Sequence, residues 1–304
     1  MNLDLVRRFL LDGTAVRGEI VSLDDCWRQI AARHDLPKCA LDTLGELAAA
    51  AVLLGATLKF DGSLILQIHG DGPVALMVVE CQSDGRIRAT AKLREGAAIA
   101  PDASLGQLVN PGGGGRFAVT LDPRIRSESR QPWQGIVPFE GDSVAQVLEN
   151  YMRRSEQLPT RMWLASGPDR ASGLLLQQLP LEGGHGAANA DADAWNRMEI
   201  LADTLTRDEL LGLPPTETLT RLFWEERLRA FEPRRIHFGC GCSRSKVVGM
   251  LRMLGVSEVE DILADRGSVE VRCDFCNEPY RFDAVDCAGL FRDTVSGNDP
   301  ERRH

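Results

Sequence analysis

Four cysteines near the C-terminal end of the sequence have the residue type and spacing of metal ligands. They form two close pairs, Cys240-Gly-Cys242 and Cys273-Asp-Phe-Cys276, with thirty residues between the pairs. Four thiolates in two such pairs can complete a tetrahedral site, and Zn²⁺ is the ion that such sites usually hold. We therefore predict one Zn²⁺ per chain, bound by Cys240, Cys242, Cys273 and Cys276. The alternative is four free structural thiols, although buried free cysteines seldom occur as two tight pairs.

The same four thiols could also take part in redox chemistry. Sulfur bound to a metal is a thiolate, and the thiolate is the form of cysteine that oxidants attack. Arg244, Lys246 and Arg272 lie close by in the sequence and would favour the thiolate further. A disulfide sulfur is a poor zinc ligand, so oxidation of either pair would release the metal. Spacing alone leaves a second possibility equally open, a structural zinc that is chemically inert.

The segment that carries these cysteines is too short to bury a large core. It starts near Ile236, and a unit of this size usually needs a metal or a disulfide to stay folded. Structural zinc contributes roughly 10–16 kcal/mol to the folding of small sites. We therefore expect the unit to unfold when the metal is removed.

The remaining cysteines and the histidines suggest no second reactive site. His237 lies three residues before Cys240, but four thiols already fill a tetrahedron, and the other histidines are scattered and form no evident catalytic dyad. Core positions are predicted for the four other cysteines, which lie in apolar patterns: Cys26, Cys39, Cys81 and Cys287.

Composition and charge exclude several classes of protein. The 304 residues are 43% hydrophobic and 6% aromatic, which is ordinary for a globular protein, and the net charge of −9 argues against general nucleic-acid binding. The longest apolar run, Leu47 to Leu58, is too short to span a membrane, and the first residues lack the order of a signal peptide. We expect a cytoplasmic protein, where thiols are kept reduced.

The first 180 residues are predicted to form an α+β domain with antiparallel sheets. Runs with a period of about two, separated by turns such as Gly70-Asp71-Gly72-Pro73, indicate a meander of strands. Strands are expected at Thr14–Leu23, Leu64–His69, Val74–Cys81, Arg86–Leu93, Phe117–Leu121, Gly135–Phe139, Thr160–Ala165 and Ser172–Leu179. Helices are expected at Leu3–Leu11, after Asp24-Asp25, from Pro37 to about Leu58, and at Val144–Ser155.

The rest of the chain is predicted to contain a linker and a small zinc domain. Residues 181–193 are dominated by Gly, Ala and Asp, which marks a domain boundary. Beyond it, Trp195–Thr206 and Glu217–Phe231 have helical patterns. The predicted organisation is an N-terminal domain at 1–180, a flexible segment and helical linker at 181–235, and a C-terminal cysteine domain at 236–304.

Several short blocks resemble one known family. The most specific block outside the cysteines is Tyr151-Met-Arg-Arg-Ser-Glu-Gln-Leu-Pro-Thr160. With the two cysteine pairs in the same order, the chain closely resembles, nearly end to end, the redox-regulated 33-kDa holdase chaperones called heat-shock protein 33. The further blocks are Val16-Arg17-Gly18-Glu19, Leu58-Lys59-Phe60-Asp61-Gly62, Gly70-Asp71-Gly72-Pro73, and Gln134-Gly135-Ile136-Val137 followed by Glu140-Gly141-Asp142.

The resemblance implies a chaperone rather than an enzyme. Members of this family are inactive as chaperones when reduced and zinc-bound. On oxidation, disulfides form within each pair, here Cys240–Cys242 and Cys273–Cys276, zinc is lost, and the zinc unit and linker unfold. A reduced monomer becomes an oxidised homodimer that holds unfolding client proteins without ATP. The sequence is consistent with independence from ATP, because it contains no GxxxxGK[ST] phosphate-binding loop. Some relatives have a further cysteine shortly after the first pair, and Ser243-Arg244-Ser245-Lys246 has none here.

The linker suits this role physically, because an amphipathic helix is stable mainly through docking of its apolar face. If the neighbouring unit unfolds, that face becomes available to clients; the alternative is a permanently docked helix.

Two other functions compete with the chaperone: a thiol–disulfide oxidoreductase at Cys273-Asp-Phe-Cys276, and a zinc-ribbon adaptor for nucleic acid or protein. The candidate client-binding residues are Trp195, Met198, Leu222, Phe223 and Trp224.

Overall fold

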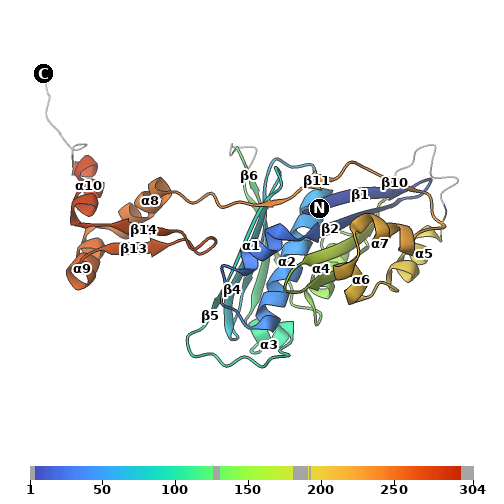
Figure 1. The fold of residues 1–304 in the computed structure, drawn as a ribbon, viewed down its shortest axis with the longest axis horizontal. Helices are drawn as coiled ribbons and strands as arrows, with labels where there is room; N and C mark the ends of the chain where they lie inside the picture. The colour runs from blue at the N-terminus through green and yellow to red at the C-terminus, as the bar shows by residue number, and fades with distance from the viewer. Residues whose placement is uncertain (1–3, 126–130, 181–190, 192, 296–304) are drawn as a thin grey trace, which may run out of the picture. The chain divides into compact units, whose positions relative to one another are not determined.

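The chain divides into two compact units that meet in sequence between Gly239 and Cys240 (Figure 1). The structure, a computed structural model, describes residues 4–125, 131–180, 191 and 193–295. The first unit holds two six-stranded sheets and most of the helices, and the second holds the four paired cysteines.

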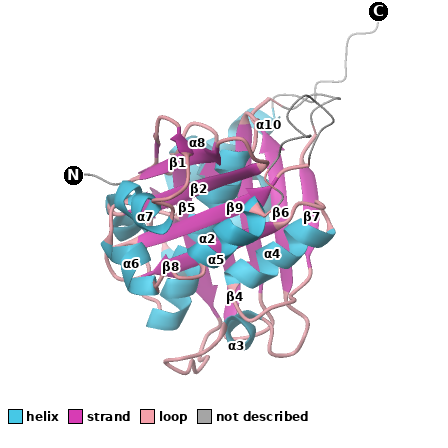
Figure 2. Ribbon diagram, turned by 90° about the vertical axis from the view of Figure 1, so that its right-hand side faces the viewer, coloured by secondary structure: helices cyan, strands magenta, loops and turns pink. Residues whose placement is uncertain are grey.

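Sheet A and sheet B of the first unit are antiparallel apart from one short edge contact, in which β12 runs parallel to β5 (Figure 2). Sheet A has the order β10 (Leu228–Ala230), β1 (Leu5–Leu11), β2 (Val16–Leu23), β9 (Ala171–Gln178) and β8 (Thr160–Ser166), with β11 (Arg234–Arg235) also on β1. Sheet B has the order β12 (His237–Phe238), β5 (Arg86–Leu93), β4 (Val74–Gln82), β3 (Gly62–His69), β6 (Arg116–Pro123) and β7 (Trp133–Val137).

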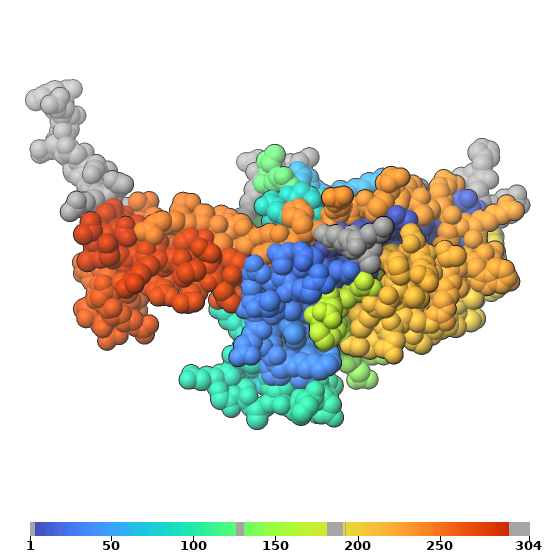
Figure 3. Space-filling view, viewed as in Figure 1, coloured from blue at the N-terminus to red at the C-terminus, as the bar shows by residue number. Residues whose placement is uncertain are grey.

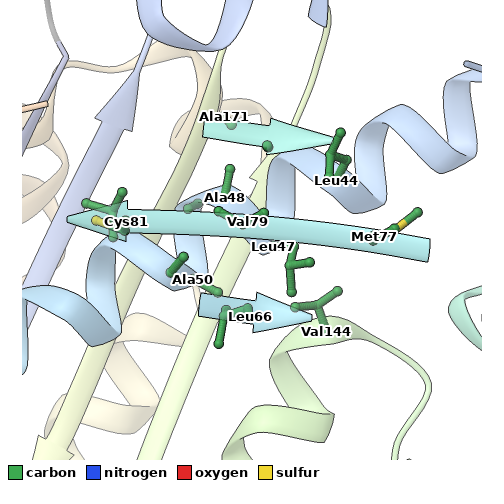
Figure 4. Close-up of a cluster of buried hydrophobic side chains, with 14 of the residues drawn as sticks. Leu44, Leu47, Ala48, Ala50, Leu66, Met77, Val79, Cys81, Val144 and Ala171 are labelled. Carbon is green, nitrogen blue, oxygen red and sulfur yellow. The ribbon is translucent and has the colours of Figure 1, made fainter. Parts of the chain in front are cut away.

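Helix α2 (Lys38–Thr57) packs against strands of both sheets and forms the centre of the larger core. It begins after Pro37, whose missing N–H has no partner to lose at a helix start. Its small residues Ala48–Ala51 are fully buried and allow strands to approach closely (Figure 4). Among the described residues, α2 is the one helix with the length and composition of a membrane span, and its buried position accounts for that composition.

Three more helices complete the body of the first unit: α1 (Asp25–Ala31), α3 (Leu105–Val109) and α4 (Val144–Arg154). Ser143 caps helix α4, because its side chain accepts a hydrogen bond from the backbone N–H of Gln146. The predicted α+β class with antiparallel sheets is confirmed.

The linker helices α5 (Ala194–Ala202), α6 (Arg207–Gly212) and α7 (Pro215–Leu222) belong to the first unit. They cover the face of sheet A that α2 leaves free, and they form a continuous yellow-to-orange layer of atoms (Figure 3). Helix α6 begins at Thr206 in a capping box with Glu209. The shared core of this layer comprises Phe9, Leu11, Val16, Ile20, Leu174, Leu176, Ala194, Met198, Ala202, Leu219, Leu222 and Phe223.

The second unit is built from α8 (Arg244–Leu254), α9 (Val256–Arg266), the hairpin β13 (Val269–Arg272) and β14 (Pro279–Phe282), and α10 (Ala284–Val295). Its core is small, as expected for a segment of this length. The buried apolar members among the described residues are Val247, Leu251, Val259, Val269, Phe282, Cys287 and Leu290.

The helix predicted at Leu3–Leu11 is wrong, because residues Leu5–Leu11 form strand β1. Val6 faces the core around α2, whereas Phe9 faces the core under the linker helices. A strand buried on both faces loses the alternation of apolar and polar residues that identifies a strand. The three-residue spacing of Val6 and Phe9 therefore imitates a helical pattern.

The helix predicted at Glu217–Phe231 is also too long, because α7 ends at Leu222. The chain then forms β10, β11 and β12, which pair with the edges of both sheets. Backbone groups at a sheet edge need partners, and this segment supplies them. Most of the boundary predicted at 181–193, namely residues 181–190 and 192, lies outside the described residues.

Glu46 on α2 gives the first unit a specific pH dependence. Burial, reinforced by nearby Asp42 and opposed by Arg207, raises the pKa of Glu46 from 4.5 to about 7. The folded chain therefore retains a proton that the unfolded chain has lost between these pH values. The free energy of unfolding should fall as pH rises through this window.

We predict that Glu46→Gln raises the free energy of unfolding by about 2 kcal/mol at pH 8 and by little at pH 5, because the amide mimics the protonated acid. Denaturant unfolding followed by tryptophan fluorescence would measure this, since all five tryptophans lie in the first unit. Glu95→Gln, at an exposed position, is the matched control. Equal effects of Glu46→Gln at both pH values would contradict the prediction.

Candidate metal centre

The second unit brings the four predicted cysteines together. Their sulfur atoms all lie within 4.8 Å of one another. Two contacts cross between the pairs, with 3.6 Å from Cys240 Sγ to Cys273 Sγ and 3.3 Å from Cys242 Sγ to Cys276 Sγ. None of the four is in a disulfide.

A tight turn between β13 and β14 positions the second pair. The backbone N–H of Cys273 donates to the carbonyl of Glu278 (3.0 Å), and the N–H of Asn277 donates to the carbonyl of Cys273 (2.8 Å). Asn277 has a φ of 60°, a left-handed conformation that asparagine tolerates better than most residues. The turn therefore points both sulfurs of this pair to one side.

The start of helix α8 positions the first pair. Ser243 directly follows Cys242 and caps the helix by accepting a hydrogen bond from the N–H of Lys246. The ammonium group of Lys246 in turn donates to the carbonyl of Gly241, between the two cysteines, at 2.5 Å. Local contacts thus fix the backbone between the two cysteines and directly after them.

The sulfur geometry fits a tetrahedral metal ion. With metal–sulfur bonds of about 2.3 Å, a regular tetrahedron places its sulfurs about 3.8 Å apart. The two separations between the pairs, 3.3 and 3.6 Å, and the 4.8 Å limit for the whole set of sulfurs bracket that value. Four sulfur donors suit zinc and exclude hard cations such as Mg²⁺ and Ca²⁺.

Burial disfavours ionisation of the Cys273 and Cys276 thiols by raising their pKa. It is the largest cause that raises the pKa of Cys273 and of Cys276, and the hydrogen bonds of Cys276 with the other three thiols raise the pKa of Cys276 further. Binding a metal ion would replace these protons, so the affinity for the ion should increase with pH.

The basic residues near the cysteines are largely occupied elsewhere. Arg244 forms an ion pair with Asp286 at 2.8 Å, and Arg272 forms one with Glu270 at 2.8 Å. Sequence proximity alone therefore overstated their role in favouring thiolates. Lys246 lies nearer the site through its bond to Gly241.

Tyr280 is a residue of the site that sequence reasoning missed. Its hydroxyl donates a hydrogen bond to Cys242 Sγ at 3.1 Å, and this bond is the first cause that raises the pKa of Tyr280. The signal was present as a tyrosine four residues after Cys276, but only the hairpin brings it to Cys242. Donors to ligand atoms orient them and tune the metal site.

The other candidate residues stay apart from this cluster. Cys26, Cys81 and Cys287 are buried, in agreement with the predicted core positions, whereas Cys39 is only partly buried. His237 lies in β12, paired with Arg86 of β5 in the first unit. Within the described part of the chain, the cluster of potential metal ligands contains cysteines alone.

The candidate client-binding residues fall into two groups. Met198, Leu222 and Phe223 are buried against sheet A, where the ring of Phe223 lies 6.1 Å from that of Phe9, and Trp195 is partly buried. Trp224 is 75% exposed. Most of this apolar surface is therefore covered in the present conformation.

Ion pairs hold the linker helices on the sheet. Arg161 of β8 contacts Asp203 at 2.9 Å and also pairs with Glu199. Arg170 pairs with Asp24 at 2.6 Å and donates to the carbonyl of Leu211 at 2.7 Å. The linker is thus attached by an apolar face and by charged contacts around it.

Comparisons with known proteins agree with this arrangement. The family model described as Hsp33 protein matches residues 4–283. The 33 kDa chaperonin of Chromobacterium violaceum is 50% identical over 99% of this chain and 98% of its own length, and that of Methylobacillus flagellatus is 48% identical over 97% and 98%. The crystal structure of the 33 kDa chaperonin from Thermotoga maritima has the same fold, with a TM-score of 0.76, 22% identity, and coverage of 96% of this chain and 99% of that one.

We predict that Tyr280→Phe weakens metal retention roughly ten-fold, because Cys242 loses the donor that stabilises its thiolate. The rate at which a chromogenic chelator removes Zn²⁺, used as the probe ion, from the reduced protein would measure this. Tyr151→Phe is the matched control, since it changes the only other tyrosine and lies in the first unit. Identical removal rates for wild type and Tyr280→Phe would show that the hydrogen bond does not matter.

Proposed function

Because this chain belongs to the Hsp33 family, whose members are chaperones and not enzymes, we propose that it is an ATP-independent holdase activated by oxidation. In the reduced state the four cysteines would bind one Zn²⁺ and the chaperone would be inactive. Oxidation would convert them to two disulfides, unfold the second unit and free the linker helices. The apolar surface so exposed would hold unfolding proteins and prevent their aggregation under oxidative stress.

One observation carries this proposal: four clustered cysteines, none of them in a disulfide, lie in the same chain as a covered apolar layer of linker helices. The thiols can sense an oxidant, and the layer can supply a surface for clients. An inert structural zinc would account for the thiols alone, and a permanently docked linker would account for the helices alone.

The ligand set explains how oxidation would act on the site. When bound, the ion supplies a positive charge that keeps all four sulfurs as thiolates and crosslinks the two pairs. Each disulfide forms as two thiolate sulfurs give two electrons to one hydrogen peroxide molecule. The O–O bond breaks, and two protons from solvent complete two water molecules. The two disulfides, Cys240–Cys242 and Cys273–Cys276, then offer no thiolate ligands.

The sulfur contacts support the coupling of these two events. Two contacts cross between the pairs, Cys240 Sγ with Cys273 Sγ at 3.6 Å and Cys242 Sγ with Cys276 Sγ at 3.3 Å. A disulfide within each pair would replace these contacts between the pairs. Oxidation therefore removes the links between the start of α8 and the β13–β14 turn, and the small remaining core cannot stabilise the unit well.

The partners follow from this mechanism. Unfolded or partly unfolded proteins would be the clients, with Trp195, Met198, Leu222, Phe223 and Trp224 among the contact residues. We propose a monomer in the reduced state, a homodimer in the oxidised state and a cytoplasmic location. Nucleic acid and membrane have no part in this function.

The first prediction from this proposal concerns the switch itself. Reduced protein should contain one Zn²⁺ per chain, and peroxide at mildly elevated temperature should release it as four thiols disappear. The oxidised form alone should then slow aggregation of a thermally unfolding client. Free-thiol titration, a zinc-sensitive dye and light scattering would follow the three events. Cys39→Ser, which leaves all four cluster cysteines in place, should behave as wild type.

Three results would each exclude part of this proposal. Zinc retained with its thiols unreactive would indicate a structural site. Oxidised, zinc-free protein that leaves client aggregation unchanged would exclude the holdase. Turnover in a disulfide-reduction assay would favour the oxidoreductase at Cys273 and Cys276.

The second prediction concerns the linker. Phe223→Ala should produce partial holdase activity without oxidant, because loss of a buried aromatic side chain weakens docking by about 3–5 kcal/mol. The zinc and free-thiol content of this variant should stay unchanged, which would show that the activity results from weaker docking of the linker and not from oxidation of the cysteines. Trp224→Ala, at the adjacent exposed position, is the matched control and should remain inactive until oxidised. A folded but inactive Phe223→Ala protein would mean that docking does not mask the client surface.

A further inference from the structure

A pocket of about 230 Å³ opens in the first unit, away from the linker layer. The C-terminal end of α2, strands of both sheets and the end of α4 enclose it, and its walls are mainly apolar, with Leu64, Leu121, Met152 and Leu158 among them. It is smaller than the roughly 300–1,000 Å³ typical of sites for drug-sized molecules, so an occupant would be small.

Sequence blocks that the redox switch does not use converge on this pocket. Arg17, Leu58 and the Tyr151–Thr160 block all contribute to its wall. Gly135 supports it from behind, because a Cβ there would lie 2.5 Å from the hydroxyl of Tyr151. Any larger residue at position 135 would force the hydroxyl of Tyr151 to shift. Residues from four separate blocks thus lie around one pocket, and neither metal binding nor client binding explains this arrangement.

The backbone beside the pocket is strained. Gln157 has a φ of 55°, and among the described residues only Asn277, at the metal centre, is another non-glycine residue with positive φ. Its neighbours Glu156 and Leu158 both line the pocket. Such strain costs of order 1–3 kcal/mol and concentrates at functional sites, which makes this turn a second candidate site.

Arg17 brings a positive charge to the pocket wall without forming a direct ion pair. Its guanidinium donates to the neutral side chain of Gln177 at 2.9 Å, and Gln177 is held by Thr160 at 3.0 Å. The nearby carboxylate of Glu19 forms its ion pair with Arg8, at 3.0 Å, and favours the charged form of Arg17 without direct contact. Within the described ranges, no carboxylate lies within ion-pair distance of Arg17. Two guanidinium groups therefore share one buried carboxylate.

The other charged residue of the wall is placed differently. Glu156 is exposed and accepts a hydrogen bond from the hydroxyl of Tyr151 at 3.1 Å. Its charge is therefore in contact with solvent, whereas burial lowers the pKa of the half-buried Arg17. An anion inside the pocket would relieve the cost of burying that guanidinium.

We propose that this pocket binds a small amphiphile with a single carboxylate, with the carboxylate on Arg17 and the hydrocarbon chain among Leu64, Leu121 and Met152. The planar guanidinium suits a carboxylate, and the apolar walls suit a hydrocarbon chain. This site is independent of the redox switch.

Octanoate is the probe, and 1-octanol, with a chain of the same length and no charge, is the matched ligand. Calorimetric titration of the reduced, zinc-loaded full chain should show saturable one-to-one binding of octanoate, at least ten-fold tighter than 1-octanol. Shortening the acid to heptanoate and hexanoate should weaken binding about four-fold per methylene. Equal affinities for octanoate and 1-octanol would overturn the role of Arg17 without any variant.

Three single variants test whether octanoate binds in this pocket. Arg17→Gln should weaken octanoate binding roughly ten-fold or more and change 1-octanol binding less than two-fold. Met152→Trp, which fills the pocket, should abolish binding of both. Arg153→Gln, a neighbouring arginine outside the pocket, is the control and should bind as wild type. Absence of saturable binding, or binding that survives Met152→Trp, would overturn the proposal.

Discussion

Burial of sheet A from both sides is the constraint on which the rest of the structure depends. Helix α2 covers the inner face and also packs on sheet B, so it joins the two sheets through one core. Helices α5–α7 cover the outer face, where Phe223 meets Phe9. Helices α5–α7 are polar on the side away from the sheet, and their stability comes from their apolar contact with sheet A. The apolar residues that shield sheet A from solvent are therefore the same residues that would become exposed if these helices detached.

Sequence patterns predicted strands such as β3 because they alternate, with one face in the core. They also predicted β2 and β9, which are buried on both faces, but they failed at β1, where Val6 and Phe9 lie three residues apart and contact different cores. They failed again after Leu222, where the strands β10–β12 exist only because remote edges at β1 and β5 offer partners. Both errors have one cause: the deciding contacts are distant in sequence and leave no local periodicity.

The candidate metal centre was predictable because its chemistry is local. Two short turns each supply two thiols, and ligand spacing alone identifies them. Tyr280 was not predictable, since its contact with Cys242 requires the β13–β14 hairpin. The pocket at Arg17 was hidden for the same reason. Its wall joins β2 to the turn after α4, and the sequence shows those blocks only as separate motifs.

The segment from β10 to β12, which directly precedes the first cysteine pair, caps one edge of each sheet. Residues Leu228–Ala230 and Arg234–Arg235 pair with β1, and His237–Phe238 pair with β5. If this segment detaches, β1 and β5 become open edges with unpaired N–H and C=O groups. Loss of the cap would thus expose hydrogen-bonding surface as well as apolar surface, in a form that can pair with any extended chain regardless of its sequence.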